Sequence, residues 1–241
     1  MLRSGNDAAL AIARGVSGSV EKFVEIMNKK AKELNMSNSI FNNPSGLDAN
    51  EEGNLSTSYD LALLMSSAIQ NDIFSQIIAT KVYKSEIGAW KNKNKLLTSY
   101  KYNLGGKTGF TDKAKRTLVT ASRQDETTLV VVTLDCGNDF NFHKFLYESN
   151  FNKYQSFKLL NKGENYIEDY IISCKKDIYI NVEKENMSKY SVVYKINNNK
   201  ATIYLVRQEK HNLVDTCNIS KQKEGNKLTF WDKIKNLLRF G

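Results

Sequence analysis

The sequence predicts a mixed α/β domain of the α+β kind, followed by a small all-β domain and a C-terminal amphipathic helix. Three patterns lead to this prediction: helical apolar spacing over residues 17–34, two adjacent strand-like runs at 117–122 and 127–135, and short β-branched runs that recur after residue 155. With 241 residues, of which 41% are hydrophobic and 25% charged, the composition is globular and allows one large or two small domains.

Helical signals dominate the first part of the chain. Residues 6–14 are Ala-rich, which is consistent with a short buried helix. Residues 17–34 place apolar side chains at three- and four-residue spacing, which predicts a longer amphipathic helix. Ser17 or Ser19 can accept hydrogen bonds from the free amides of its first turn.

Turn and strand signals follow. Asn-Pro-Ser-Gly at 43–46 predicts a turn, because Pro fixes φ and Gly permits φ > 0. Residues 57–60 resemble a capping box, with Asp in the usual Glu position, and begin another helix. Residues 117–122 and 127–135 predict two strands joined by a polar turn, and a further helix ends near Tyr154.

The pattern of residue types changes near residue 155. Short β-branched and aromatic runs are separated there by polar turns such as 197–199, a spacing typical of a small all-β domain. These runs lie at 170–173, 178–182, 191–196 and 201–206.

The end of the chain reads as a polar linker, 220–226, and an amphipathic helix, 227–240. On a helix its large apolar side chains fall on one face, and the surrounding residues are rich in Lys and Arg. Such a basic helix with Trp and Phe on its apolar face can lie in a lipid interface. The alternative is a helix docked on its own protein.

Two short motifs point to chemistry. Ser-Gly-Asn occupies residues 4–6, an S-x-N motif, and Lys-Thr-Gly occupies residues 107–109 within a Gly-rich stretch. Together with S-x-x-K, these motifs mark penicillin-binding proteins and class A β-lactamases. Two further segments lie between them in order, Phe-Asn-Asn-Pro-Ser-Gly-Leu-Asp at 41–48 and Asn-Lys-Leu-Leu at 94–97.

These four segments resemble the serine D-alanyl-D-alanine carboxypeptidases, the low-molecular-weight penicillin-binding proteins of peptidase family S11. A β-lactamase is a weaker match, because it needs no added β-domain. The resemblance implies a penicillin-binding/β-lactamase-like transpeptidase domain over residues 1–154, a small β-rich domain over 155–219, and a linker and amphipathic tail over 220–241. It implies no cofactor and no metal site.

The implied reaction removes the terminal D-Ala from peptidoglycan stem peptides through a serine acyl-enzyme. By this resemblance Ser4 relays a proton between the catalytic lysine and the leaving nitrogen, and Asn6 hydrogen-bonds the substrate amide and that lysine. The residue types alone leave structural alternatives open, a helix N-cap for Ser4 and a turn residue for Asn6.

The second motif is expected to bind the substrate. Lys107 and Thr108 would hold its carboxylate, Gly109 would let backbone approach closely, and the amide of Phe110 would stabilise the oxyanion. The substrate would pair along this segment as an added strand. A surface lysine is the alternative for Lys107.

The nucleophile has no matching position. The three S-x-x-K segments, at 19–22, 173–176 and 220–223, all follow the S-x-N motif, whereas the family order is the reverse. We therefore expect an N-terminally incomplete domain that is inactive alone. The alternative function is a non-catalytic envelope- or membrane-binding module derived from the family.

Charge and family resemblance suggest the partners. The net charge of +9 favours anionic surfaces, but no aromatic–basic signature for nucleic acid is present, and we expect no nucleic-acid binding. The resemblance implies stem peptides ending in D-Ala-D-Ala, β-lactam antibiotics in the full-length form, and a membrane surface contacted through 227–240. The implied location is the extracytoplasmic face of the cell membrane, although this chain carries no signal peptide.

The three cysteines are far apart and odd in number. Cys136, Cys174 and Cys217 therefore argue against a disulfide framework and a zinc site, and we interpret them as small buried hydrophobes. A thiol–imidazole pair of Cys136 with His143 is an alternative for which no orienting third group is evident.

Overall fold

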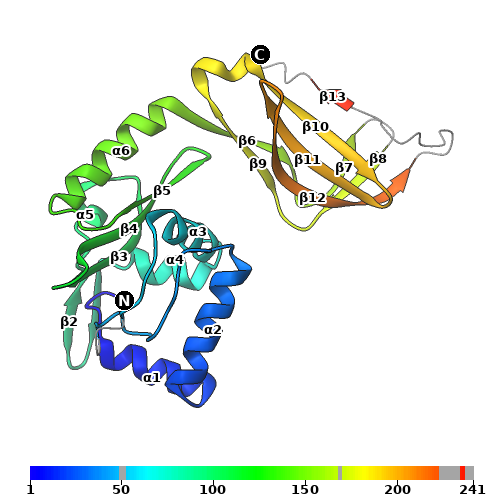
Figure 1. Cartoon of the computed structure of the whole chain (residues 1–241). Coiled ribbons are helices and arrows are strands. Elements are labelled where there is room, and N and C mark those ends of the chain that lie inside the picture. The colour runs from blue at the N-terminus through cyan, green and yellow to red at the C-terminus, as the bar shows by residue number, and fades with distance from the viewer. Residues whose placement is uncertain (49–52, 168–169, 223–233, 237–241) are drawn as a thin grey trace. The chain divides into compact units, whose positions relative to one another are not determined.

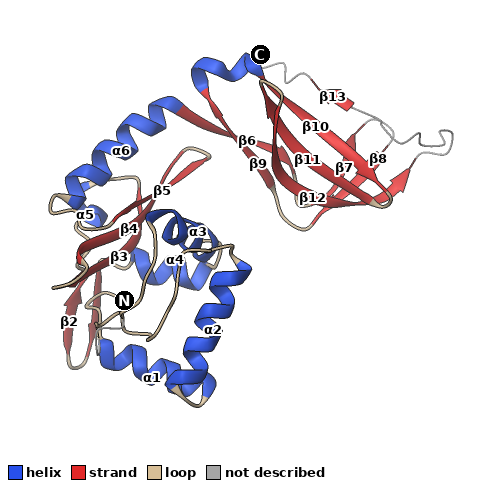
Figure 2. Cartoon of the chain, in the orientation of Figure 1, coloured by secondary structure: helices blue, strands red, loops and turns tan. Residues whose placement is uncertain are grey.

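The computed structural model describes residues 1–48, 53–167, 170–222 and 234–236. The chain forms two compact units, Met1–Ser149 (unit 1) and Asn150–Gly241 (unit 2), and most of their helices and strands are labelled in Figure 1. Unit 1 mixes helices and strands, whereas unit 2 consists mainly of strands (Figure 2). The predicted class, a mixed α/β domain followed by an all-β one, is confirmed.

A three-stranded antiparallel sheet lies at the centre of unit 1. Its order is β3 (Asn103–Thr111), β4 (Lys115–Gln124) and β5 (Thr127–Thr133), so β4 is central and β3 is an edge strand. The two predicted strands correspond to β4 and β5.

Helices cover both faces of this sheet. Side chains alternate along a strand, so neighbouring residues of β4 face opposite sides. Ala121 packs with α3 (Ser58–Ala68) and α4 (Asp72–Ala79), whereas Thr120 bonds to side chains of α6 (Asp139–Lys153). The central strand is therefore held from two directions.

Two helices begin unit 1. α1 (Asn6–Ser17) ends at Gly18, whose φ of 81° stops the helix, and α2 (Val20–Glu33) begins after it. Ser19 is the N-cap of α2 and accepts a hydrogen bond from the Lys22 amide. The predicted start at residue 17 is wrong, because Ser17 still belongs to α1.

The expected turn at 43–46 forms. The Asn43 side-chain oxygen accepts hydrogen bonds from the amides of Ser45 and Gly46, and Gly46 has a φ of 81°. The predicted capping box forms only in part. Thr57 accepts from the Asp60 amide, but the Asp60 carboxylate instead accepts from the Asn38 amide and the Ser39 hydroxyl.

Between α4 and β3 lie a hairpin and a short helix. β1 (Val82–Ser85) and β2 (Gly88–Lys91) pair with each other, and α5 (Leu96–Ser99) follows. The segment between β2 and α5 returns to the neighbourhood of the N-terminus, where the Lys93 amide donates to the Leu2 carbonyl.

Unit 2 contains two antiparallel sheets. One is the pair β6 (Tyr154–Leu160) and β9 (Ile178–Glu183), and the other has six strands in the order β13-β10-β11-β12-β8-β7. Apolar side chains of both sheets form one core, and the short 3-10 helix Lys184–Lys189 follows β9. The strands of the larger sheet are β7 (Gly163–Ile167), β8 (Tyr170–Cys174), β10 (Tyr190–Asn197), β11 (Lys200–Arg207), β12 (Lys210–Gln222) and β13 (Ile234–Asn236).

The structure corrects the interpretation of the cysteines. Cys174 and Cys217 form a disulfide, with their Cα atoms 4.8 Å apart. The pairing of β8 with β12 sets Ser173 opposite Asn218, which brings the two neighbouring cysteines together although 43 residues separate them. Cys136 is a free thiol.

The structure also changes the picture of the C-terminal segment. Most of the predicted helix 227–240 lies outside the described residues, but Ile234–Asn236 is strand β13, which pairs with β10. The helix prediction is therefore wrong at these three residues. The predicted linker 220–226 begins inside β12, and its residues 223–226 lie outside the described part. No described helix is both long and apolar enough to span a bilayer.

Candidate active site

A cleft of about 960 Å³ opens in unit 1. Its walls come from the N-terminal segment, the 43–46 turn, the segment after β2, strands β3 and β4, and the start of α6. The structure brings all the site residues predicted from the sequence to this cleft: Ser4, Asn6, Lys107, Thr108, Gly109 and Phe110.

Glycines let β3 lie close to its neighbours. Gly105 has a φ of 138°, and a Cβ added there would overlap the main chain of Ile78 in α4. At Gly109 an added Cβ would overlap the Thr117 hydroxyl of β4. The close approach expected at Gly109 therefore involves its own sheet neighbour, which holds the edge strand in place beside the cleft.

The two motifs meet through a hydrogen bond. Lys107 Nζ donates to Ser4 Oγ at 2.6 Å, although 103 residues separate them, and it also donates to the Thr108 carbonyl. Ser4 has a φ of 58°, in the left-handed region that non-glycine residues seldom adopt. Residues held in sparsely populated backbone conformations often lie at functional sites.

The structural alternatives for the motif residues do not hold. Gly5, not Ser4, is the N-cap of α1, and Asn6 is the first residue of that helix rather than a turn residue. Lys107 is half-buried beside Ser4, so it is not a surface lysine.

Burial sets the electrostatics of this contact. It lowers the pKa of Lys107, and the nearby Lys93 ammonium lowers that pKa further. Because the Ser4 oxygen accepts from Lys107, the Ser4 hydroxyl proton is available to a bound molecule. The pair therefore presents a cation and a hydroxyl donor side by side, which suits an acceptor such as a carboxylate.

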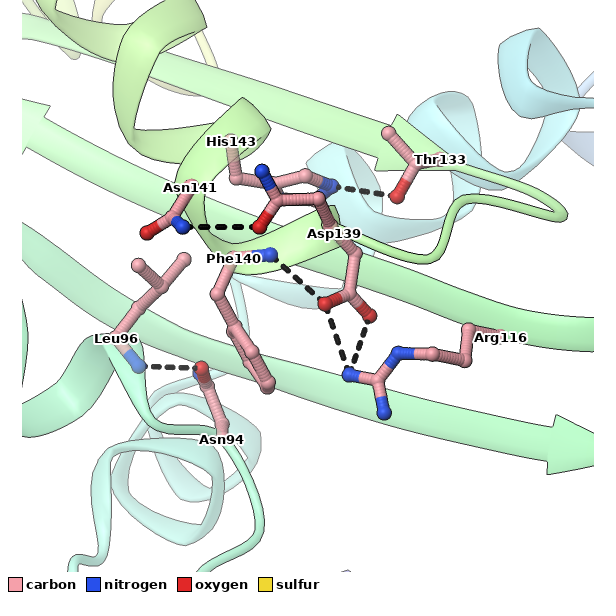
Figure 3. A network of polar contacts seen from close by, with 9 residues as sticks. Asn94, Leu96, Arg116, Thr133, Asp139, Phe140, Asn141 and His143 are labelled. Carbon is pink, nitrogen blue, oxygen red and sulfur yellow. Dashed lines mark hydrogen bonds and ion pairs between the residues drawn. The ribbon is translucent and has the colours of Figure 1, made fainter.

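Arg116 of β4 lines the cleft next to the exposed Phe110, with which it pairs in register. One Arg116 nitrogen donates to both Asp139 carboxylate oxygens at 2.8 and 2.9 Å, and the guanidinium lies 5.5 Å from the Phe140 ring centroid. Asp139 is only 2% exposed and also accepts from the Phe140 amide (Figure 3). These contacts fix the cation and the aromatic ring that line the cleft.

His143 has a structural role behind the sheet. Its Nδ1 lies 2.8 Å from Thr120 Oγ1 and its Nε2 lies 3.0 Å from Thr133 Oγ1, the latter contact drawn in Figure 3. Complete burial lowers the pKa of His143 to about 4. The alternative pair with Cys136 is wrong, because threonine hydroxyls occupy both ring nitrogens.

Ser19, which begins the first S-x-x-K segment, caps α2, and its side chain is engaged by the helix. Ser173 and Ser220 belong to strands β8 and β12 of unit 2.

Sequence reasoning missed several residues of the cleft. Ser45, Gly46 and Leu47 line it, although the sequence indicates only a turn and a family resemblance for this segment, with no role in the site. Further cations also line it: Arg3, Lys91, Lys93, Lys95 and Arg116. The alternating Lys-Asn-Lys-Asn-Lys of 91–95 was visible in the sequence, but its position beside residues 1–6 was not.

A family comparison decides the relationship. The family model described as D-alanyl-D-alanine carboxypeptidase (Peptidase S11) matches residues 1–138. The chain belongs to this family. D-alanyl-D-alanine carboxypeptidase DacF of Bacillus subtilis is 38% identical over 136 residues, which cover 54% of this chain and 34% of that protein. The family member DacA of Escherichia coli is 27% identical over 236 residues, 90% of this chain and 56% of that protein.

Solved structures agree with the carboxypeptidase family assignment. Penicillin binding protein 5 from Haemophilus influenzae superposes with a TM-score of 0.74 at 23% identity, covering 91% of this chain and 71% of that one, which shows a shared fold. Penicillin-Binding Protein D2 from Listeria monocytogenes, in a cefotaxime-bound form, is 30% identical with a TM-score of 0.58 and covers 63% of each chain. This chain thus spans only part of its relatives.

Proposed function

We propose that the cleft of unit 1 binds the D-Ala-D-Ala end of peptidoglycan stem peptides, and that it serves D-alanyl-D-alanine carboxypeptidase chemistry. The hydrogen bond between Lys107 and Ser4 is the observation on which this rests, because it joins the S-x-N and K-T-G motifs in one cleft. In this proposal Lys107 and the Thr108 hydroxyl hold the terminal carboxylate. Ser4 passes a proton to the leaving nitrogen, and Asn6 bonds the substrate amide.

The position of β3 supports a strand-like binding mode. Among the described strands β3 pairs only with β4, so its other edge is available to an extended peptide. Phe110 lies at the cleft on this strand, and we assign its amide to the developing oxyanion. Gly109, between Thr108 and Phe110, adds no side chain to obstruct the peptide.

Acyl transfer also requires a serine nucleophile with its base. The S-x-x-K segments of residues 1–241 all follow Ser4, and Ser19 is engaged as a helix cap. We therefore propose that residues 1–241 by themselves bind the peptide without forming an acyl-enzyme. We also propose that the same cleft takes a β-lactam when a serine nucleophile is present, in line with the cefotaxime-bound form of Penicillin-Binding Protein D2.

The proposed location is the extracytoplasmic face of the cell membrane, where stem peptides are found. The Cys174–Cys217 disulfide supports it, because disulfides persist in oxidising compartments.

Calorimetric titration tests the binding proposal. N-acetyl-L-Gln-D-Ala-D-Ala should bind saturably, and the same peptide ending in L-Ala-L-Ala should not. Lys107→Ala should weaken binding roughly tenfold or more, because a charge-assisted hydrogen bond is lost. Lys29→Ala on the exposed face of α2 removes the same charge away from the cleft and should have no effect.

Equal affinity for the two peptide ends, or an unchanged affinity in Lys107→Ala, would contradict the binding proposal. Labelled penicillin tests the second part separately. A stoichiometric label on residues 1–241 that hydroxylamine releases would show acyl-enzyme formation, and the expectation of binding without acylation would then be wrong.

A further inference from the structure

The charges that line the cleft are unbalanced. Six cationic residues line it, and no Asp or Glu does so among the described residues. Arg116 is paired with Asp139, and Lys107 is bonded to Ser4. The other four form what we call the cationic rim and have no ion pair within the described chain: Arg3, Lys91, Lys93 and Lys95.

The cationic rim is built on a fixed backbone. Along residues 91–95 the lysines are exposed, while Asn92 is half-buried and Asn94 is buried. The Asn92 side chain donates to the Thr80 carbonyl at 3.0 Å and accepts from the Asn94 amide at 2.9 Å. The Asn94 side chain then accepts from the Leu96 amide, as Figure 3 shows. The asparagine side chains thus hold the backbone of this segment, while the three lysine side chains remain exposed.

The rim lies beside the catalytic motifs. The Lys93 amide donates to the Leu2 carbonyl at 3.2 Å, which ties residues 91–95 to the segment that carries Arg3 and Ser4. Lys93 is also close enough to Lys107 to lower its pKa. Like charges repel each other, so a bound anion would offset the repulsion between these two ammonium groups.

The terminal carboxylate of the substrate cannot by itself neutralise all the cations that line the cleft. In the proposed function it is held by Lys107 and Thr108, and the four cations of the rim remain without a counter-charge. Fixed cations around a partly enclosed cleft raise the local concentration of anions and favour ligands of opposite charge.

We propose that the cationic rim is a second anion subsite, which selects peptides carrying a free carboxylate on the residue before the terminal D-Ala-D-Ala. This inference rests on the proposed function, since it assigns the substrate class of the same cleft. A peptide in which that carboxylate is amidated keeps its shape but loses the interaction with Arg3, Lys91, Lys93 and Lys95.

A matched pair of peptides tests the subsite on the 241-residue chain. N-acetyl-L-Glu-D-Ala-D-Ala should bind about three- to tenfold more tightly than N-acetyl-L-Gln-D-Ala-D-Ala in low salt, as partly exposed charge pairs allow. The ratio should fall toward one in about 0.5 M NaCl, because salt screens exposed charges. Lys93→Gln combined with Lys91→Gln should lower the ratio in the same way, whereas the surface control Lys29→Gln should leave it unchanged.

The outcomes separate the two proposals. Equal affinity of the Glu and Gln peptides for the wild-type chain would overturn the second subsite and leave D-Ala-D-Ala binding intact. A preference that persists in the double variant would place the carboxylate elsewhere and also overturn it. Failure of both peptides to bind would instead overturn the proposed function, and the subsite with it. Binding of the Gln peptide by the double variant shows that the variant is folded.

Discussion

The two units of this chain are stabilised by different kinds of interior. Unit 2 has a core of apolar side chains from two sheets, and Ser156 is its one buried polar residue among those described. Unit 1 has buried apolar side chains too, such as the cluster of Met65, Ile78 and Ala121. It also buries a set of polar or charged side chains: Asp60, Asn94, Thr120, Ser122, Thr127, Thr133, Asp139 and His143. A buried polar group is costly unless it is hydrogen-bonded, so such a set needs a specific arrangement of partners.

The unit with the many buried polar side chains is also the unit that contains the cleft. In unit 1 three of the buried polar groups hold parts that line it: Asn94 holds the 91–95 segment, Asp139 holds Arg116, and His143 ties α6 to β4. Unit 2 has no comparable set among its described residues and is cross-linked by a disulfide. The comparison teaches that polar interiors in this chain position a site, while apolar packing and a covalent bond maintain a scaffold.

The largest expected effect concerns the scaffold. Cys174→Ser with Cys217→Ser should destabilise unit 2 by about 4 kcal/mol, because the bond closes a loop of 43 residues and restricts the unfolded chain. Hydrogen exchange resolved by peptide should rise in unit 2 and stay constant in unit 1. Cys136→Ser, which removes the free thiol, is the control, and a comparable rise in unit 1 would contradict the separation of the units.

The next effect concerns the polar interior. Burial holds the pKa of His143 near 4, below its value of 6.5 in an unfolded chain, so the unfolded state takes up the proton first. Stability of unit 1 should be complete above about pH 6.5 and should fall by about 3 kcal/mol as the pH drops toward 4.

Denaturant unfolding at a series of pH values, read by hydrogen exchange of unit 1 peptides, measures this loss. Carboxylates also titrate near the lower end of this pH range. His143→Gln, which cannot titrate, should therefore reduce the change of the unfolding free energy with pH between 6.5 and 5. His211→Gln alters the other, exposed histidine and should retain the slope. An unchanged slope in the His143 variant would exclude this cause.

The smallest effect tests whether Ser19 is structural. Ser19→Ala should destabilise α2 by about 1 kcal/mol, because the Lys22 amide loses its acceptor. Exchange of α2 peptides measures this, and Lys22→Ala should change it little. If Ser19→Ala abolished peptide binding without altering exchange, Ser19 would belong to the site and the proposed division of roles would be wrong.

Local signals in the sequence were enough for much of unit 1. The cap at Ser19, the turn at 43–46 and the strand pair β4–β5 were predicted because each depends on residues within a few positions of one another. Strands such as β7 and β12 were missed, since polar residues interrupt their alternation and pairing with neighbours decides them.

The sequence by itself determined the family, because four motif segments in a fixed order identify it without knowledge of the three-dimensional structure. It also determined which residues to examine, Ser4, Asn6 and 107–110. Only the tertiary structure decided that Lys107 meets Ser4, that Cys174 meets Cys217, and that 91–95 lies beside Arg3. These contacts join residues far apart in the chain, and the strand pairing and chain reversals that bring them together leave no periodic pattern in the sequence.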